Sequence, residues 1–431
     1  MNAGLDQLSG RNRGLLAVMA LLCATVCAPD AAATELFNRG PARLVLSGYV
    51  QQATGVTHLP WASEGVAKGL IPEDSAFQGG TLRVRWGLDL GKIARLDVHN
   101  RVLWNLSAPP QTTGMGSLIG VGSSAPPKRW LDLNTTLAKG DGFAVQHDLD
   151  RLKLTVETPV ADLKLGRQAI TWGFASVIPV ADVWVQQSPF ELDRIEKRGV
   201  DALRALMYPR DDIEMDLVIA DRGSWAELSG GLRVAYGGDH VEAYVVAAKQ
   251  WRDLWAAAGV TLLVDVWKIR TEVAAPWSLD DVPSGGPNGF DALRASFGVD
   301  RIGSDITVSA EVAWNGPGAG SPGGYLKAFS APALQRGTSY VVGRLYGAAL
   351  LSWKAGDLWT LSGTAMANLR DPSALLAATL QWDVAAGANL MASVYGGIGD
   401  APDLSNPLAP RLGSEFGTYG VVALLQAVVH F

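Results

Sequence analysis

The sequence predicts an all-β fold, a single transmembrane antiparallel β-barrel of about eighteen strands with short periplasmic turns and long extracellular loops. Three observations carry this prediction. Segments of about ten residues with alternating apolar and polar side chains recur along the chain. Short and long connections alternate between these segments, and the last segment ends on an aromatic residue, Phe431, where such barrels commonly end.

The composition fits an all-β chain that enters or crosses a membrane without helices. The chain has 431 residues, is 48% hydrophobic and 18% charged, and contains 49 glycines and 15 tryptophans. Beyond residue 33 it lacks the run of about 18 apolar residues that a membrane-spanning helix requires. Its formal net charge of −6 at pH 7 argues against a nucleic-acid-binding protein.

Residues 1–33 have the features of a secretory signal peptide, which leaves 34–431 as the barrel. Two arginines precede an apolar stretch over 15–28, and three alanines then offer a cleavage site. The alternative, a short membrane anchor, is disfavoured because about 14 apolar residues do not span the bilayer. Both cysteines, Cys23 and Cys27, lie in this segment, so we expect no disulfide, thiolate metal site, or cofactor bound through cysteine in the mature chain, and no cofactor or metal at all.

The alternating segments define the predicted strands. In chain order they are 42–53, 80–90, 93–105, 147–158, 161–170, 199–208, 211–221, 227–236, 239–249, 255–264, 267–275, 290–300, 304–314, 338–353, 357–369, 372–385, 387–398 and 418–431. Their number is even, as in single-chain bacterial barrels.

The length of each predicted connection depends on whether it follows an even-numbered or an odd-numbered strand. Tight turns follow even-numbered strands, at 91–92, 159–160, 209–210, 237–238, 355–356 and 386. Long Gly/Pro-rich connections follow only odd-numbered strands, at 54–79, 106–146, 171–198, 276–289, 315–337 and 399–417. A soluble sandwich has no reason to sort its loops in this way, whereas an outer-membrane barrel has periplasmic turns and longer external loops.

The polar face of each strand is predicted to face the lumen. Arg83 and Arg85 alternate with Leu82, Val84 and Trp86, and a guanidinium facing lipid at mid-bilayer would cost about 2–4 kcal/mol. Parity predicts these pore-lining residues: Arg83, Arg85, Arg95, Asp97, Arg101, Lys153, Arg233, Arg270, Arg294 and Arg344. The arginines on the second and third strands outnumber the acids there, which favours anionic solutes. Alternatively, the charges pair across a filled interior and stabilise the wall.

A barrel of this size encloses a lumen that wall side chains do not fill, so a loop must narrow it. The 171–198 loop is apolar in its first half and charged in its second, and we predict that it folds inward. The alternatives are an external loop that contacts a partner or lipid, and a constriction by the 106–146 loop instead.

The strand-loop-strand segment around this loop resembles that of alginate-export-type and related outer-membrane porins. It reads LKLGRQAITWGFASVIPVADVW, followed by KRGVDALRALMYP. The resemblance implies a barrel channel, which in some members passes an anionic polysaccharide through an arginine-lined constriction. The residues assigned to the constricting loop and its base are Arg167, Gln168, Trp184, Glu191, Asp193, Arg198, Asp201 and Arg204. Strict alternation places Arg167 on the outer side, so either a bulge at Gly166 turns it inward or it lies at the polar rim.

The predicted function is that of a porin-like channel in the bacterial outer membrane, not an enzyme. It would serve the passive passage or export of hydrophilic solutes, small or polymeric, with anionic solutes among them. The expected partners are outer-membrane lipid, the solute, and the barrel-assembly machinery acting through Phe431, with no nucleic acid. One alternative is a filled barrel with a structural or adhesive role. A barrel hydrolase is another, but its candidate base, His99, has no serine beside it in sequence.

Overall fold

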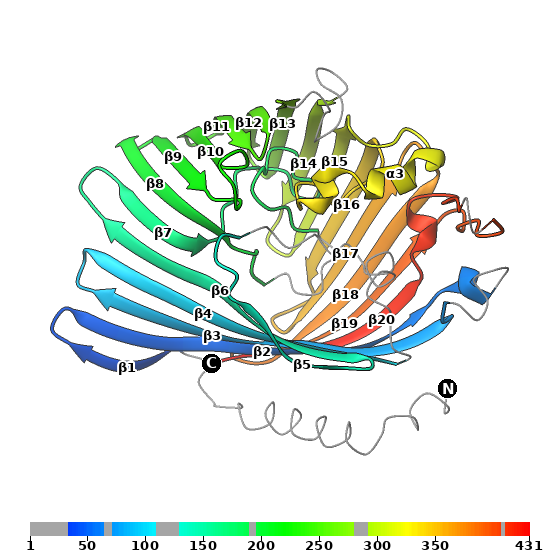
Figure 1. Ribbon diagram of the computed structural model, residues 1–431, viewed down its shortest axis with the longest axis horizontal. Helices are drawn as coiled ribbons and strands as arrows, with labels where there is room; N and C mark the ends of the chain where they lie inside the picture. The colour runs from blue at the N-terminus through cyan, green and yellow to red at the C-terminus, as the bar shows by residue number, and fades with distance from the viewer. Residues whose placement is uncertain (1–32, 64–70, 109–128, 189–194, 280–291, 407–409) are drawn as a thin grey trace, which may run out of the picture.

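The protein forms one closed antiparallel barrel (Figure 1). The computed structural model describes residues 33–63, 71–108, 129–188, 195–279, 292–406 and 410–431. Almost all of the predicted signal peptide therefore lies outside the described residues, as do Glu191 and Asp193. Within the described part, no helix is long and apolar enough to span a membrane.

Eighteen of the strands that the structure describes make up the closed wall, and they match the eighteen predicted strands one to one. They are β2 (Ala42–His58), β3 (Asp74–Leu90), β4 (Ala94–Ala108), β6 (Phe143–Glu157), β7 (Asp162–Gln168), β8 (Val200–Arg210), β9 (Ile213–Ala220), β10 (Ser229–Gly237), β11 (Val241–Gln250), β12 (Asp253–Val264), β13 (Trp267–Ser278), β14 (Arg294–Ile302), β15 (Ile306–Asn315), β16 (Leu345–Lys354), β17 (Trp359–Asn368), β18 (Ser373–Ala385), β19 (Ala388–Ile398) and β20 (Val421–His430). The predicted fold class is confirmed.

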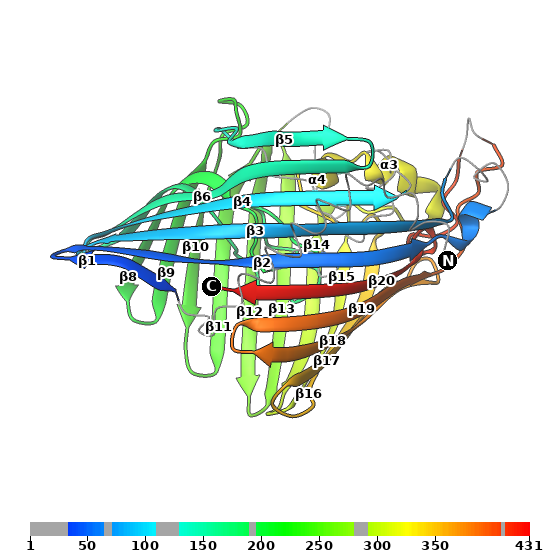
Figure 2. The same ribbon diagram turned by 90° about the horizontal axis from the view of Figure 1, so that it is seen from below.

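The barrel closes between β2 and β20. Tyr49 of β2 pairs with His430 of β20, and β2 pairs with β3 on its other side; Figure 2 shows β20 lying beside β2. Closure leaves the wall without free strand edges, so its backbone N–H and C=O groups are satisfied within the sheet, as a hydrocarbon environment requires. Two further strands extend the sheet: β1 (Thr34–Arg39) pairs with β2, and β5 (Asn134–Gly140) pairs with β6.

In the described part of the chain, helices are short and lie only in the connections between strands. They are η1 (Pro60–Ser63), η4 (Pro322–Gly324), α3 (Tyr325–Phe329), α4 (Pro332–Gln335) and η5 (Phe416–Thr418). The long connections, among them 169–199, 316–344 and 399–420, all lie at one end of the barrel. The opposite end carries tight turns such as 91–93 and 386–387, together with the start of β2 and the end of β20.

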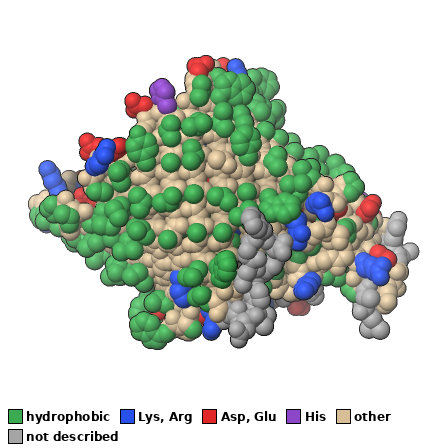
Figure 3. All heavy atoms as spheres, turned by 90° about the horizontal axis from the view of Figure 1, so that it is seen from above, with side chains coloured by type: hydrophobic (Ala, Val, Ile, Leu, Met, Phe, Trp, Pro, Cys, Tyr) green, Lys and Arg blue, Asp and Glu red, His purple; other side chains and the backbone are tan. Residues whose placement is uncertain are grey.

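The two faces of the wall differ as the sequence predicts. On β3, the Arg83 side chain is fully buried inside the barrel, whereas Trp86 and Leu90 on the outer face are 37% and 44% exposed. Figure 3 shows rows of hydrophobic side chains over the outer surface of the strands, with charged side chains gathered toward its margins. An apolar band bounded by polar rims is the surface that a bilayer requires.

Two strand boundaries differ from the prediction for identifiable reasons. The first hairpin is longer than predicted, because the pairing of β2 with β3 continues to His58 and Asp74. The predicted strand at 338–353 begins at Leu345, because residues 339–343 lie buried inside the barrel instead of pairing along the wall.

Arg167 is buried next to an irregular backbone position, Gly166. Gly166 has a φ of +109°. Leu163 and Leu165 are exposed on the outer face, whereas Arg167 is 2% exposed and donates to Asp201 and to the carbonyl oxygen of Leu149. A Cβ at position 166 would lie 2.1 Å from the carbonyl oxygen of Leu152. Glycine is therefore required here. The pairing of β7 with β6 and with β8 continues through Gly166 and Arg167 without a register shift, so the strands show no bulge at this position.

We predict that Gly166→Ala destabilises the folded barrel by at least about 1–2 kcal/mol, because alanine is strained at positive φ and also clashes with Leu152. The loss of the heat-resistant folded band on unheated SDS gels at lower temperature would report it. The matched control is Gly237→Ala, since a Cβ at Gly237 meets nothing within 4 Å. Equal thermal resistance of both variants would contradict the need for glycine at position 166.

Candidate functional site

The first half of the 169–199 connection folds into the barrel, as predicted. We call residues 169–188 the inner segment. Most of its apolar side chains are buried, with Trp172 and Trp184 each 1% exposed and packed edge to face at 5.1 Å between ring centroids. One cluster joins the segment to β8, β9 and β11–β13, and a second joins it to β15–β18.

The inner segment crosses the lumen. It leaves the wall at β7 and reaches Glu311 on β15, eight strands further along a wall of eighteen. That is close to the diametrically opposite position. In Figure 1 the connection between β7 and β8 accordingly runs through the interior of the barrel.

Two buried carboxylates hold the inner segment through its backbone. Glu311 accepts hydrogen bonds from the backbone nitrogens of Ser176 (3.0 Å), Val177 (3.3 Å) and Ile178 (2.8 Å). It also pairs with Arg270 at 2.8 Å.

Glu272 on β13 binds the two residues of the inner segment that directly precede those bound by Glu311. It accepts hydrogen bonds from the backbone nitrogens of Phe174 and Ala175 and from the hydroxyl of Tyr244. Both carboxylates are at most 3% exposed. They accept hydrogen bonds from backbone N–H groups that would be costly to bury without an acceptor.

A second connection, 316–344, also enters the barrel and contacts the inner segment. The backbone nitrogen of Gln186 donates to the carbonyl oxygen of Gly337 at 3.0 Å, and the Tyr340 hydroxyl donates to the carbonyl oxygen of Val177. The lumen is therefore narrowed by two loops that are bonded to each other as well as to the wall.

Three arginines of β3 and β4 pair with acids that come from other elements. Arg83 pairs with Asp150 of β6 at 2.9 Å and with Glu196 at 2.7 Å. Arg85 pairs with Glu196 at 2.6 Å, and Arg101 pairs with Asp148 at 3.1 Å. The excess of base over acid expected from the two strands alone is thus offset by β6 and by the loop before β8.

Glu196 is the loop carboxylate around which these cations gather. Its oxygens lie within 4 Å of Arg83, Arg85, Arg151 and His99. Burial opposes ionisation of Glu196, but the nearby His99 and the charges of Arg83 and Arg85 outweigh burial and lower its pKa to about 2. The group is therefore a carboxylate at any physiological pH.

The other predicted lumen residues are all engaged by neighbours. Arg95 pairs with Asp89 and Asp97, Lys153 with Asp97, Arg233 with Glu214, and Arg270 with Asp300 and Glu311, while Arg294 donates to the Thr338 carbonyl and Arg344 to the Gly318 carbonyl. The predicted lumen residues differ in how much of the side chain remains exposed. Arg83, Arg270 and Arg294 are at most 3% exposed, whereas the Arg85 and Lys153 side chains each retain 27%.

The residues predicted at the base of the loop come together on β7 and β8. Arg167 donates to both carboxylate oxygens of Asp201, at 2.7 and 3.0 Å, and Arg204 makes the same bidentate contact with Asp216. Gln168 donates to the carbonyl oxygen of Ala202. Of the remaining residues assigned to the loop and its base, Trp184 lies in the buried cluster, Arg198 is partly buried before β8, and Glu191 and Asp193 lie outside the described residues.

The second candidate for a constriction, the 106–146 connection, extends the wall instead where it is described. Its β5 pairs with β6. Arg129, five residues before β5, pairs with Asp148 at 2.8 Å and with Asp150 at 2.9 Å. It belongs to the site although the sequence analysis did not assign it there.

A third buried carboxyl group, Glu415, joins the external connections to the wall. Its carboxyl oxygens accept hydrogen bonds from the Tyr346 hydroxyl at 2.7 Å, from Asn368 at 2.7 Å and from the backbone nitrogen of Val342 at 3.2 Å. Its own backbone nitrogen donates to Asp371 at 2.8 Å. Connections 316–344 and 399–420 are thereby bonded to β16 and β17.

The surroundings of Glu415 favour its protonated form. Burial is the main cause, and the neighbouring carboxylate of Asp371 adds to it, so that the pKa of Glu415 rises to about 7. The other titratable groups around it are Tyr325, Tyr346 and Tyr419, which contribute no positive charge.

The comparisons with known proteins agree with the fold. No family model matches the chain, and no curated protein matches its sequence. Among solved structures it resembles Acinetobacter baumannii OccAB2, with a TM-score of 0.51 and 8% identity over 89% of this chain and 98% of that chain. It also resembles Pseudomonas aeruginosa OpdK, solved with vanillate, with a TM-score of 0.51 and 8% identity over 90% and 98%. The chain therefore has a porin-type barrel fold.

We predict that Glu311→Ala releases the inner segment. The substitution removes the acceptor of three backbone N–H groups and one of the two carboxylate partners of Arg270, which keeps Asp300, at a cost of about 3–5 kcal/mol for a broken buried ion pair. Limited proteolysis should then cut within 169–188 while the barrel stays intact. The control is Asp383→Ala, an acid at the short-turn end of β18 that accepts a hydrogen bond from Gln381. Equal protection of the segment in both variants would refute its anchoring by Glu311.

We predict that the thermal stability of the protein falls as the pH rises through about 7. The pKa of Glu415 is raised on folding, from its usual 4.5 to about 7, so its stabilising effect is complete below pH 4.5 and disappears above pH 7. The shift corresponds to about 3 kcal/mol. Glu415→Gln should flatten this part of the pH profile, whereas Asp403→Asn, at a fully exposed carboxyl group in the same connection, should not. Parallel profiles for the wild type and Glu415→Gln would contradict the assignment.

Proposed function

We propose that the protein is a porin-like channel of the bacterial outer membrane that passes hydrophilic solutes by diffusion. The observation that carries the proposal is a set of charged side chains that point into the barrel and still keep solvent contact. Arg85 and Lys153 are each 27% exposed at the side chain, and Glu196 is 17% exposed. Water-accessible charge beside a loop that narrows the lumen is the arrangement of a selective pore.

The charge pattern supports anionic solutes among those that pass. Around Glu196 four basic side chains converge on one carboxylate, and Arg85 is the most exposed of the arginines in that group. The structurally similar OpdK was solved with vanillate. A solute of this size fits a narrowed lumen better than a polymer does, so we propose small hydrophilic anions ahead of an exported polysaccharide.

The apolar outer band supports insertion in lipid, and the end of β20 supports the barrel-assembly machinery as a partner. Phe431 follows β20 directly, and its backbone bonds with Gly48 in both directions, at 2.7 and 3.0 Å. Recognition of this terminal residue would precede closure of the barrel against β2.

A filled barrel with a structural role is the second candidate. It is favoured by the two inner loops, which bury apolar side chains against both halves of the wall. Planar-bilayer recording with the purified protein separates the two functions. A channel gives discrete conductance steps, and a filled barrel gives none at any voltage.

We predict that Arg85→Glu lowers the anion preference of the channel. In water, a unit charge about 8 Å from a passing ion is worth about 0.5 kcal/mol, so reversing one charge changes the difference between the anion and cation energies by about 2 kcal/mol. Without screening by salt this corresponds to a change of about 30-fold in the anion-to-cation permeability ratio. Reversal potentials in a salt gradient measure this ratio. Arg210→Glu is the control, because Arg210 is 69% exposed and pairs with Asp212 in a tight turn. An unchanged ratio in Arg85→Glu would remove Arg85 from the pathway.

A further inference from the structure

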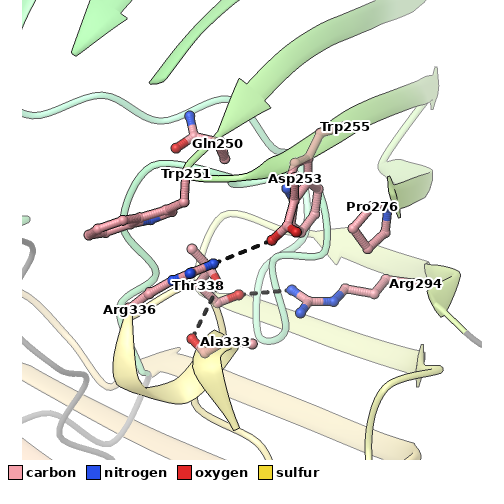
Figure 4. A pocket seen from close by; sticks show the side chains of 9 residues that line it. All are labelled: Gln250, Trp251, Asp253, Trp255, Pro276, Arg294, Ala333, Arg336 and Thr338. Atoms are coloured by element: carbon pink, nitrogen blue, oxygen red, sulfur yellow. Dashed lines mark hydrogen bonds and ion pairs between the residues drawn. The ribbon is translucent and has the colours of Figure 1, made fainter. Parts of the chain in front are cut away.

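A small buried cavity lies between the wall and connection 316–344, near the long-loop end of the barrel. Its lining comes from the ends of β11, β12, β13 and β14 and from the segment around α4 (Figure 4). Gln250, Asp253, Trp255, Arg294 and Thr338 line it and are all at most 6% exposed. The cavity measures about 10 Å³, which is room for one particle the size of a water molecule.

Arg294 is the central feature of this cavity. Its Nη1 donates to the carbonyl oxygen of Thr338 at 2.8 Å, and its guanidinium lies 5.2 Å from the ring centroid of Trp255. Figure 4 shows the guanidinium directed from β14 toward Thr338 and Arg336. Within the described part of the chain, Arg294 has no carboxylate partner, and its Nε is buried without an acceptor.

The other unsatisfied groups of the cavity lining are also donors. The indole nitrogen of Trp255 and the amide nitrogen of Gln250 are buried and, in the described part of the chain, have no acceptor. Among the buried side-chain atoms of the described residues that line the cavity, these three N–H donors have no acceptor. Such a lining is complementary to an electron-rich particle, because each unmet buried donor costs about 1–3 kcal/mol.

The charges of the lining leave a net excess of one positive charge. Arg294 and Arg336 contribute two positive charges, and Asp253, which lies 3.4 Å from Arg336, contributes one negative charge. The Arg336 guanidinium is stacked on Trp251 at 5.0 Å, and the Arg222 guanidinium approaches the same ring at 5.2 Å. A buried guanidinium without a counter-charge is costly, and a monovalent anion would neutralise the excess.

We propose that this cavity binds a small monovalent inorganic anion, such as chloride, between Arg294, Arg336 and the Trp255 indole. The cavity is too small for an organic solute, so it is a fixed site distinct from any path of permeation. The bound anion would hold α4 and residues 336–338 against the wall. Because Gly337 accepts the hydrogen bond of Gln186, the anion would also stabilise the inner segment. The inference does not rest on the proposed function.

Bromide replaces chloride in such sites and is visible by its anomalous scattering. In crystals of the wild-type protein soaked in bromide, we expect an anomalous peak within hydrogen-bonding distance of Arg294 Nε. Thermal unfolding in detergent should occur several degrees higher in chloride than in gluconate of equal ionic strength. No peak, together with equal unfolding temperatures in the two salts, would mean that the cavity holds water and would overturn the proposal.

A variant pair shows whether Arg294 carries the effect. Arg294→Gln should lose the difference between chloride and gluconate, whereas Arg233→Gln should keep it, because Arg233 pairs with Glu214 at 2.7 Å and does not line the cavity. A chloride effect that survives in Arg294→Gln would place the anion elsewhere. If Arg294→Gln does not fold, the bromide experiment on the wild type still decides the question, and neither readout depends on conductance.

Discussion

The interior of this barrel depends on the exchange of hydrogen bonds between buried carboxylates and the backbone of the inner segment. The segment is apolar and lies where bulk water does not reach its backbone, so its N–H groups need acceptors from the wall. Glu272 and Glu311 supply them, and Arg270 balances the charge of Glu311. Neither side of this contact is stable alone, since the carboxylates would be as costly to bury without donors as the donors without acceptors.

The cost of burying a charge without a partner also divides the charged side chains of the lumen into two groups. Arg83 and Arg270 are fully enclosed by acids and neighbouring chain, so they stabilise the wall and present no charge to a passing solute. Arg85 and Lys153 also have acidic partners but remain partly exposed. Parity along a strand reports only that a side chain points inward, and burial decides which of the two groups it joins.

The fold was predictable because its signals are local. The alternation of apolar and polar side chains can be read within one strand, and the connection lengths within one pair of strands. Together they predict all eighteen barrel strands. The site needed information from further away. Glu272 and Glu311 contact residues 97 to 135 positions earlier, and Arg167 is buried against Asp201, 34 positions later. Residues 339–343 have the apolar character of a strand, and only the contacts of the inner loops distinguish them from one.

The inner loops are attached to the wall at separate places, which shapes how the lumen can open. Glu272 and Glu311 hold the inner segment to β13 and β15, Glu415 holds connections 316–344 and 399–420 to β16 and β17, and Arg294 of β14 holds Thr338. Contacts on different strands with no shared partner contribute almost independently to stability. Loss of one therefore frees one stretch of loop while the others keep their positions, so the lumen should widen in discrete steps. The hydrogen bond between Gln186 and Gly337 couples two of these attachments, and it is the contact through which a change at Arg294 reaches the inner segment.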